Sequence, residues 1–213
     1  MKLGALVLCD DTWHPAATVR QGLEPLRSHG FDFEFLEDGA AWSAARMAEF
    51  PLVILAKSNM VSSTVSTPWL TAESQSAFSD YLQRGHGLLV VHAGTSRYDQ
   101  LPAINNLIGG AFARHPDQCA VTLEPKAFHE LTKGVGTFTV RDEHYFMAMN
   151  DDAQTDVFLH SHSEHGVQPA GWTRCVGSGR VCALTPGHNL EVWLHPSFQK
   201  LLLNALRWTT KLN

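Results

Sequence analysis

The sequence lacks any apolar run long enough to cross a membrane and any cluster of basic residues. A membrane-spanning helix needs about 18 or more consecutive apolar residues. Lysine and arginine number 16 against 21 acidic residues, so the formal net charge is −5. Nucleic-acid binding depends on concentrated positive charge facing the phosphates. We therefore expect neither a membrane nor a nucleic acid as a partner.

Cysteine is also scarce, and its four copies are widely spaced: Cys9, Cys119, Cys175 and Cys182. This spacing predicts reduced thiols and not a disulfide framework. The opening stretch MKLGALVLCDD carries one lysine and an apolar run too short for a secretory signal, so it predicts a first strand. Together these features predict a cytoplasmic protein.

What the sequence does contain is a regular alternation of strand-like and helix-like segments. The 213 residues are 44% hydrophobic, enough for one sizeable core, and we expect a single domain over residues 1–213. Predicted strands cover 3–9, 31–38, 51–57 and 87–91, and predicted helices cover 16–30, 42–50 and 71–85. This pattern predicts an α/β fold with a doubly wound, mostly parallel sheet of at least five strands and helices on both faces.

Beyond residue 118 the pattern changes. Short strand-like runs separated by turns, such as AVTLE, TFTVRD, DVFLHSH and GWTRCV, predict some antiparallel pairing. The chain then closes with a predicted amphipathic helix over 197–209, packed by Phe198, Leu202 and Trp208.

The stretch GLLVVHAGTSRY, residues 87–98, carries the first chemical signal. Its apolar run reads as a central strand covered on both faces, and open α/β sheets bind ligands at the carboxyl ends of such strands. In hydrolases of this architecture, a tight turn at that point presents a Ser or Cys nucleophile between small residues. Here the residue presented is His92.

Other histidines also follow predicted strands, among a total of 12 in the chain. His14 follows the first strand and His188 follows RVCALTP, so with parallel strands they would share one rim with His92. Imidazole is the commonest metal ligand, which makes these three candidates for a metal site. A single histidine is more often a structural group, but three at strand ends favour a functional site.

Further candidates surround this rim. His115 and the acids Asp142 and Glu143 could supply acid–base catalysis, although neighbours on an extended chain point in opposite directions, so one acid would face the site. Four residues near these segments are candidates for substrate binding: Trp172, Arg174, Tyr98 and Tyr145. Core packing for Trp172 and a surface ion pair for Arg174 are equally open. His160 and His162 alternate onto one face of a strand, a spacing that can chelate a metal ion. The polar turn beside them also fits a solvent-exposed strand edge.

The ordered segments GHGLLVVHAG, IGGAFARHP, FTVRDEHY, PAGWTRCVGSGRVCALTPGHN and VWLHPSFQKLLLNALRW resemble the trehalose-utilisation (ThuA-like) family, from about residue 2 to 210. The resemblance implies a relative of class I glutamine amidotransferases with a flavodoxin-like layout. It implies that His92 takes the place of the amidotransferase nucleophilic Cys and that His188 lies near that of its catalytic His, although His195-Pro196 also mimics the amidotransferase His-Pro pair. Val90 stands where a small residue is usual, which predicts a less strained turn.

The leading hypothesis is a cytosolic protein that acts on a sugar or keto-sugar, an oxidised disaccharide of the trehalose type as the family name implies. A divalent metal, with zinc the first choice, would be held by His14, His92 and His188. Either Glu143 or Asp142 would be the base. No nucleotide cofactor is expected, because CDDTWHPA lacks a glycine-rich phosphate turn, so a redox role would need a partner dehydrogenase. A homo-oligomer remains open.

Two alternatives compete with a metal-assisted sugar hydrolase or isomerase. A non-catalytic sugar-binding or regulatory protein could have kept the scaffold and lost its nucleophile. An amidohydrolase would have to use Cys9 or Cys175, neither of which stands at an activating turn. A glutamine amidotransferase is excluded, because an imidazole at the turn cannot form the required thioester.

Overall fold

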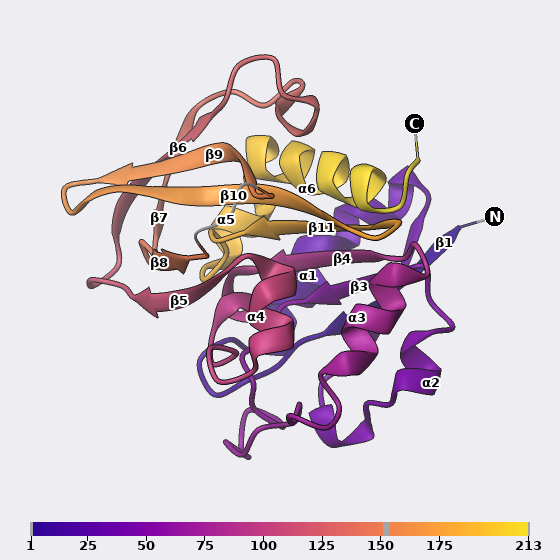
Figure 1. The fold of residues 1–213 in the computed structure, drawn as a ribbon. Coiled ribbons are helices and arrows are strands. Elements are labelled where there is room, and N and C mark those ends of the chain that lie inside the picture. The colour runs from indigo at the N-terminus through magenta and orange to yellow at the C-terminus, as the bar shows by residue number, and fades with distance from the viewer. Residues whose placement is uncertain (1, 151–153, 213) are drawn as a thin grey trace.

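A nine-stranded sheet forms the centre of the computed structural model, which describes residues 2–150 and 154–212 (Figure 1). The strand order is β2-β1-β3-β4-β11-β10-β9-β6-β7. The first five of these run parallel, and the last four join them by antiparallel pairing. These strands are β1 Leu3–Leu8, β2 Phe31–Leu36, β3 Leu52–Leu55, β4 Gly87–Val91, β6 Cys119–Pro125, β7 Phe138–Asp142, β9 Asp156–Ser163, β10 Gly166–Val176 and β11 Gly179–Leu184. A separate antiparallel pair joins β5 Gly110–Arg114 to β8 Phe146–Met149.

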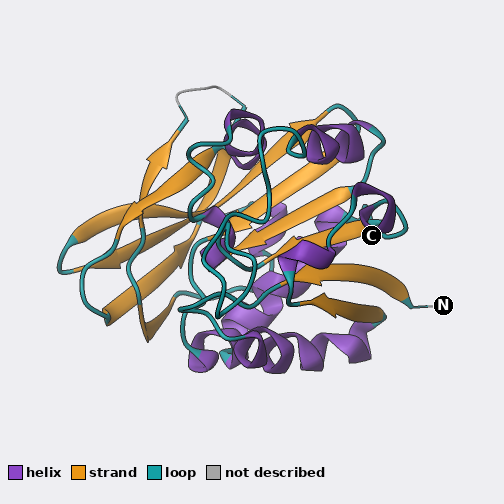
Figure 2. Cartoon of the chain, turned by 90° about the horizontal axis from the view of Figure 1, so that it is seen from below, coloured by secondary structure: helices purple, strands orange, loops and turns teal. Residues whose placement is uncertain are grey.

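Helices cover both faces of the sheet (Figure 2). The α-helices are α1 Ala16–Leu23, α2 Ala44–Met47, α3 Ser76–Gln83, α4 Pro102–Ile108, α5 Leu190–Leu194 and α6 Pro196–Thr209. Short 3-10 helices are η1 Glu24–His29, η2 Gly39–Ala41, η3 His92–Thr95 and η4 Glu130–Thr132.

Alternation along the strands creates two cores. In β1, Ala5 and Val7 face a core shared with α1, α5 and α6, whereas Leu6 and Leu8 face a core shared with α2, α3 and α4. Successive side chains of a strand point to opposite faces, so a strand that is apolar at every position must be covered twice. This confirms the expected α/β class with a large mixed sheet.

Several predicted boundaries shift for local reasons. The helix expected from residue 71 begins at Ser76, because hydrogen bonds between Thr71 and Ser74 hold the preceding residues in turns. The helix expected over 16–30 ends at Leu23 and continues as η1, whose second residue is Pro25. The antiparallel strands expected after residue 118 are present.

The C-terminal helix also agrees with the prediction, with Phe198 and Leu202 fully buried and Trp208 half-buried. All four cysteines are free. Within residues 2–150 and 154–212, no helix has the length and apolar character needed to cross a membrane.

Candidate functional site

A sharp turn at the end of β4 presents His92. This residue lies at the start of η3 with a φ of 47°, in the left-handed region that side chains other than glycine rarely adopt. Two residues later, a Cβ atom on Gly94 would lie 2.1 Å from the carbonyl oxygen of Leu55, so only glycine allows the turn to pass so close to β3. The backbone at His92 thus has the positive φ of a tight presenting turn, with Val90 two residues before it.

His14 stands in the loop after β1 and is oriented by Asp11. The Asp11 carboxylate accepts from His14 Nδ1 at 2.8 Å and from the backbone N–H of Ser58 at 2.8 Å. Burial alone would raise the pKa of Asp11, but these bonds outweigh it and hold the pKa well below its usual range. Asp11 was not among the predicted site residues, although an acid three residues before a strand-end histidine was a usable signal.

His188 is positioned through its backbone by Asp142. The two carboxylate oxygens of Asp142 accept from the N–H of Gly187 at 2.8 Å and from the N–H of His188 at 3.0 Å. Asp142 is buried beneath this loop, whereas its neighbour Glu143 points the other way, into the site. Of the two acids left open by the sequence, Glu143 is the one that faces the pocket.

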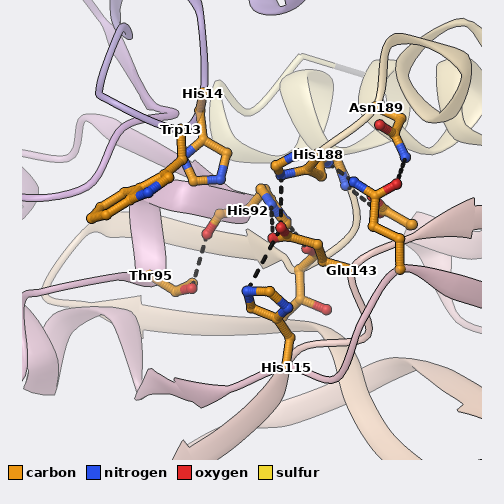
Figure 3. Close-up of polar contacts among 12 residues, drawn as sticks. Trp13, His14, His92, Thr95, His115, Glu143, His188 and Asn189 are labelled. Carbon is orange, nitrogen blue, oxygen red and sulfur yellow. Dashed lines mark hydrogen bonds and ion pairs between the residues drawn. The ribbon is translucent and has the colours of Figure 1, made fainter. Parts of the chain in front are cut away.

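Together these elements bring four side chains to one point, which we call the histidine cluster: His14, His92, His188 and Glu143 (Figure 3). One potential ligand atom from each lies within 4.8 Å of the others. Glu143 lies 3.4 Å from His92 Nε2 and 3.2 Å from His188 Nδ1. His92 Nδ1 donates to the Thr185 carbonyl oxygen at 2.7 Å, which leaves its Nε2 as the atom with a lone pair.

Electrostatics couple the members of the cluster. Burial would raise the pKa of Glu143, but the imidazoles of His188 and His92 outweigh it and hold that pKa well below its usual range. The Glu143 carboxylate in turn raises the pKa of His188. Burial lowers the pKa of His14, despite the opposing effect of Asp11. His14 is thereby kept neutral near pH 7, the form in which imidazole binds metals.

The donor set suits a small divalent metal ion. Among the described residues, His14 Nε2 is buried without a hydrogen-bond partner, and the buried atoms His92 Nε2 and His188 Nδ1 face only the Glu143 carboxylate. Buried polar atoms without partners are rare and call for an explanation such as an ion. A tetrahedral site with bonds of 2.0–2.1 Å separates its ligand atoms by about 3.3 Å, close to the 3.2 and 3.4 Å that join Glu143 to His188 and His92.

The cluster opens into a cavity of about 790 Å³. The Tyr145 ring stacks on His92 with centroids 4.1 Å apart. His115 reaches the cavity from β5, with Nε2 3.6 Å from Glu143, while its Nδ1 lies 2.7 Å from the Pro116 carbonyl oxygen. Trp13 and Phe112 contribute aromatic surface. The structure therefore brings His115 and Tyr145 to the site together with the predicted histidines.

Three predicted substrate-binding residues lie elsewhere. Trp172 is fully buried, and its indole N–H donates to the Ile108 carbonyl oxygen at 2.7 Å. Arg174 is buried on the same strand and donates to Thr155 at 2.6 Å. Tyr98 is buried, with its hydroxyl bonded to Lys57 and Trp69. None of the three lines the cavity: Trp172 and Tyr98 belong to the core shared with α2, α3 and α4, and Arg174 is buried on β10.

The structure also places the two other histidine pairs that the sequence singled out, His188 with His195 and His160 with His162. His195 Nδ1 accepts from the Ser197 N–H at 3.2 Å, so it caps α6, and His188 is the histidine that joins the cluster. His162 pairs with Glu124 at 2.8 Å on a partly exposed face of β9, so it faces solvent as one of the two readings held. The strand itself is not an edge, because β9 lies between β10 and β6.

Residues 8–209 match the family described as ThuA, trehalose utilisation. The chain belongs to the ThuA family. No curated protein matches the sequence. Among solved structures, a ThuA-like protein from Parabacteroides merdae ATCC 43184 is 18% identical with a TM-score of 0.76, covering 99% of this chain and 90% of its own.

Two further solved structures resemble this ThuA-family chain. A ThuA-like protein from Bacteroides uniformis ATCC 8492 is 20% identical with a TM-score of 0.72, covering 97% of this chain and 91% of its own. A protein from Salmonella typhimurium described as cytoplasmic is 12% identical with a TM-score of 0.68, covering 97% of this chain and 98% of its own. At these identities the likeness shows the fold.

Proposed function

We propose that this ThuA-family protein is a cytoplasmic enzyme of carbohydrate utilisation that converts a sugar or keto-sugar at a divalent metal ion, with zinc the first choice. The observation that carries the proposal is the convergence of three buried imidazole nitrogens on one carboxylate, at the floor of a large open cavity. His14, His92 and His188 would hold the ion. Asp11 and the Thr185 carbonyl oxygen orient two of these rings, as outer partners of metal-bound histidines do.

A bound divalent ion would supply Lewis acidity toward a carbonyl or hydroxyl oxygen of the substrate. Glu143 is the proposed base, since its depressed pKa keeps it ionised and it faces the cavity. His115 Nε2 faces Glu143 and would take that proton from it, since Nδ1 already donates to the Pro116 carbonyl oxygen. Because the His115 side chain is partly exposed, it would then release the proton to solvent. These roles suit hydrolysis or isomerisation, both of which need proton transfer beside a polarised oxygen.

The relation to amidotransferases concerns the scaffold and not the chemistry. The parallel strand order β2-β1-β3-β4-β11 supports the flavodoxin-like, doubly wound layout implied by the family resemblance. Thiol chemistry has little support, since Cys9 is buried and burial raises its pKa to about 12. We also propose that no nucleotide cofactor is used, so that any redox step on the sugar belongs to a separate dehydrogenase.

Metal content tests the proposal first. Wild-type protein purified without chelator should carry about one equivalent of zinc or a similar divalent ion by elemental analysis. His92→Ala and His188→Ala should each lose it, because a site with so few ligands seldom survives the loss of one. His160→Ala is the matched control, since His160 is exposed on β9 and outside the cluster. A metal-free wild type that also ignores added zinc, manganese and magnesium would refute the metal site.

Turnover tests the second part of the proposal, the enzymatic conversion of a sugar or keto-sugar. The metal-loaded protein should convert 3-keto-disaccharides, and Glu143→Gln should abolish conversion while leaving substrate binding measurable. If the wild type binds these sugars without ever converting them, the non-catalytic sugar-binding reading replaces the enzyme.

A further inference from the structure

A second cavity adjoins the one above the histidine cluster. It has a volume of about 370 Å³, and Arg97 and Asp99 line both cavities. These two residues belong to the segment 96–101, which follows η3 directly and separates the cavities as a ridge. The turn that presents His92 therefore continues into the wall between the two spaces.

The ridge is fixed in place by its buried middle residue. The Tyr98 hydroxyl donates to the Lys57 carbonyl oxygen at 3.0 Å and accepts from Trp69 Nε1 at 3.1 Å. With Tyr98 pointing inward, Arg97 and Asp99 are both exposed on the ridge. Arg97 has a φ of 64°, and its guanidinium has no bonding partner within the described part of the chain. Strained residues of this kind are concentrated at ligand clamps.

Apolar atoms make up most of the exposed lining of the second cavity, whose apolar residues are Pro68, Leu70 and Leu101. Thr71 and Gln100 also line it, beside Arg97 and Asp99 of the ridge. The amide of Asn59 also lines it, but that amide is saturated by the Leu70 backbone, donating to the carbonyl at 3.1 Å and accepting from the N–H at 3.0 Å. The surface left for a ligand is therefore suited to an apolar ring more than to hydroxyl groups.

The first cavity contains an aromatic platform at its rim. Trp13 is 55% exposed, unusual for so large an apolar side chain, and it lines this cavity next to His14 (Figure 3). Its backbone N–H donates to the same Asp11 carboxylate that orients the His14 ring, at 3.0 Å. The buried Asp11 carboxylate therefore fixes both the Trp13 backbone and the His14 ring.

We propose that the two cavities form one cleft for a glycoside with an apolar, ring-containing aglycone. The sugar ring lies against Trp13 with its hydroxyl groups toward the cluster. The glycosidic oxygen lies over the ridge. Beside it, Arg97 donates to one sugar hydroxyl and Asp99 accepts from another. The aglycone ring occupies the cavity lined by Pro68 and Leu101. The inference rests on the proposed function for its sugar half, whereas the aglycone half depends on the second cavity alone.

Binding to zinc-saturated protein tests this with three probes: methyl glucoside, phenyl glucoside and trehalose. Calorimetry should show phenyl glucoside binding about tenfold more tightly than methyl glucoside, because a buried phenyl ring adds apolar contact area. Pro68→Asp places a charge in the second cavity and should abolish that difference, with methyl glucoside binding unchanged. Val65→Asp is the matched control, since Val65 is exposed in the same loop and lines neither cavity.

Trp13→Ala should weaken both glucosides alike, by about tenfold, because the platform serves the sugar ring that they share. Equal affinity of wild type for the two glucosides would overturn the aglycone site and leave sugar binding intact. Tighter binding of trehalose than of phenyl glucoside would show that the second cavity takes a sugar, which overturns its apolar assignment. Failure of all three probes to bind wild type would overturn the inference, whereas the proposed function stands or falls separately, on metal content and on conversion of 3-keto-disaccharides.

Discussion

Each histidine of the cluster is fixed by a different kind of partner. A carboxylate holds the His14 ring, a backbone carbonyl holds the His92 ring, and the His188 backbone is held by Asp142. In no case does the partner occupy the ring nitrogen that faces the centre of the cluster, so those nitrogens remain available. The cluster is therefore oriented before any ligand arrives, which reduces the ordering cost of binding.

Asp11 should matter to metal affinity although it lies outside the cluster. The Asp11 carboxylate orients the His14 ring and makes that ring more basic. Asp11→Asn removes this charge and with it both effects. Zinc affinity should fall by about 10- to 100-fold, as measured by competition with a chelator of known affinity. Asp117→Asn, at an exposed acid with no bonding partner within the described residues, should leave the affinity unchanged. Equal affinities of the two variants would contradict the orienting role.

Metal binding should also depend on pH in a defined direction. Glu143 raises the pKa of His188 in the metal-free protein, so protons compete for this ring from a higher pH than for free imidazole, whose pKa is about 6.5. Zinc affinity should thus decline steadily between about pH 8 and 6. Glu143→Gln should move the onset of this decline to lower pH. A dissociation constant that stays flat over this range would show that His188 is not a ligand.

At the scale of elements, the β4–η3 turn makes the site possible. The turn passes close to the end of β3. At Gly94 it lies so near the Leu55 carbonyl oxygen that there is no room for a side chain. The same turn sets the direction of His92 and the start of the ridge at residue 96.

Gly94→Ala should therefore destabilise the fold as well as the site. The added Cβ would meet a backbone oxygen at 2.1 Å, which cannot move without displacing β3. The free energy of unfolding should fall by about 2 kcal/mol or more in urea titrations. Gly136→Ala is the matched control, since an added Cβ there meets nothing within 4 Å, and its effect should stay within about 0.5 kcal/mol. Similar losses in both variants would argue against a steric requirement at the turn.

For the whole molecule, the cluster joins distant parts of the chain. Its members follow β1, β4, β7 and β11, so an ion bound there would link loops from both halves of the sequence. An ion that binds only the folded state stabilises the entire sheet by mass action.

Zinc should consequently raise the thermal midpoint of chelator-treated protein. At a free concentration of 100 times the dissociation constant, the gain is about 2.7 kcal/mol, or about 5–10 °C for a protein of this size. Calorimetry or dye-based melting measures the shift, and excess chelator should reverse it. His92→Ala should melt at the same temperature with and without zinc. A wild type insensitive to zinc would contradict the linkage.

Local pattern alone predicted the four strands of the first half and the positions of three of its helices, because apolar periodicity depends on near neighbours in the chain. The bounds of the helices and the presence of α4 did not follow from it. It also predicted that His14, His92 and His188 share a rim, since parallel strands bring their carboxyl ends to one edge of the sheet. The placement of Glu143 opposite Asp142 follows the twofold alternation of an extended chain, but the sequence could not say which of the two faces inward.

Only the tertiary structure decided which aromatic residues meet the ligand space. Trp172 and Tyr98 have the composition of binding residues, yet α4 and the segment around Trp69 cover them. Trp13 remains exposed because the loop after β1 is folded around Asp11. Burial depends on contacts between segments far apart in the sequence, and no local pattern encodes which face another element will cover.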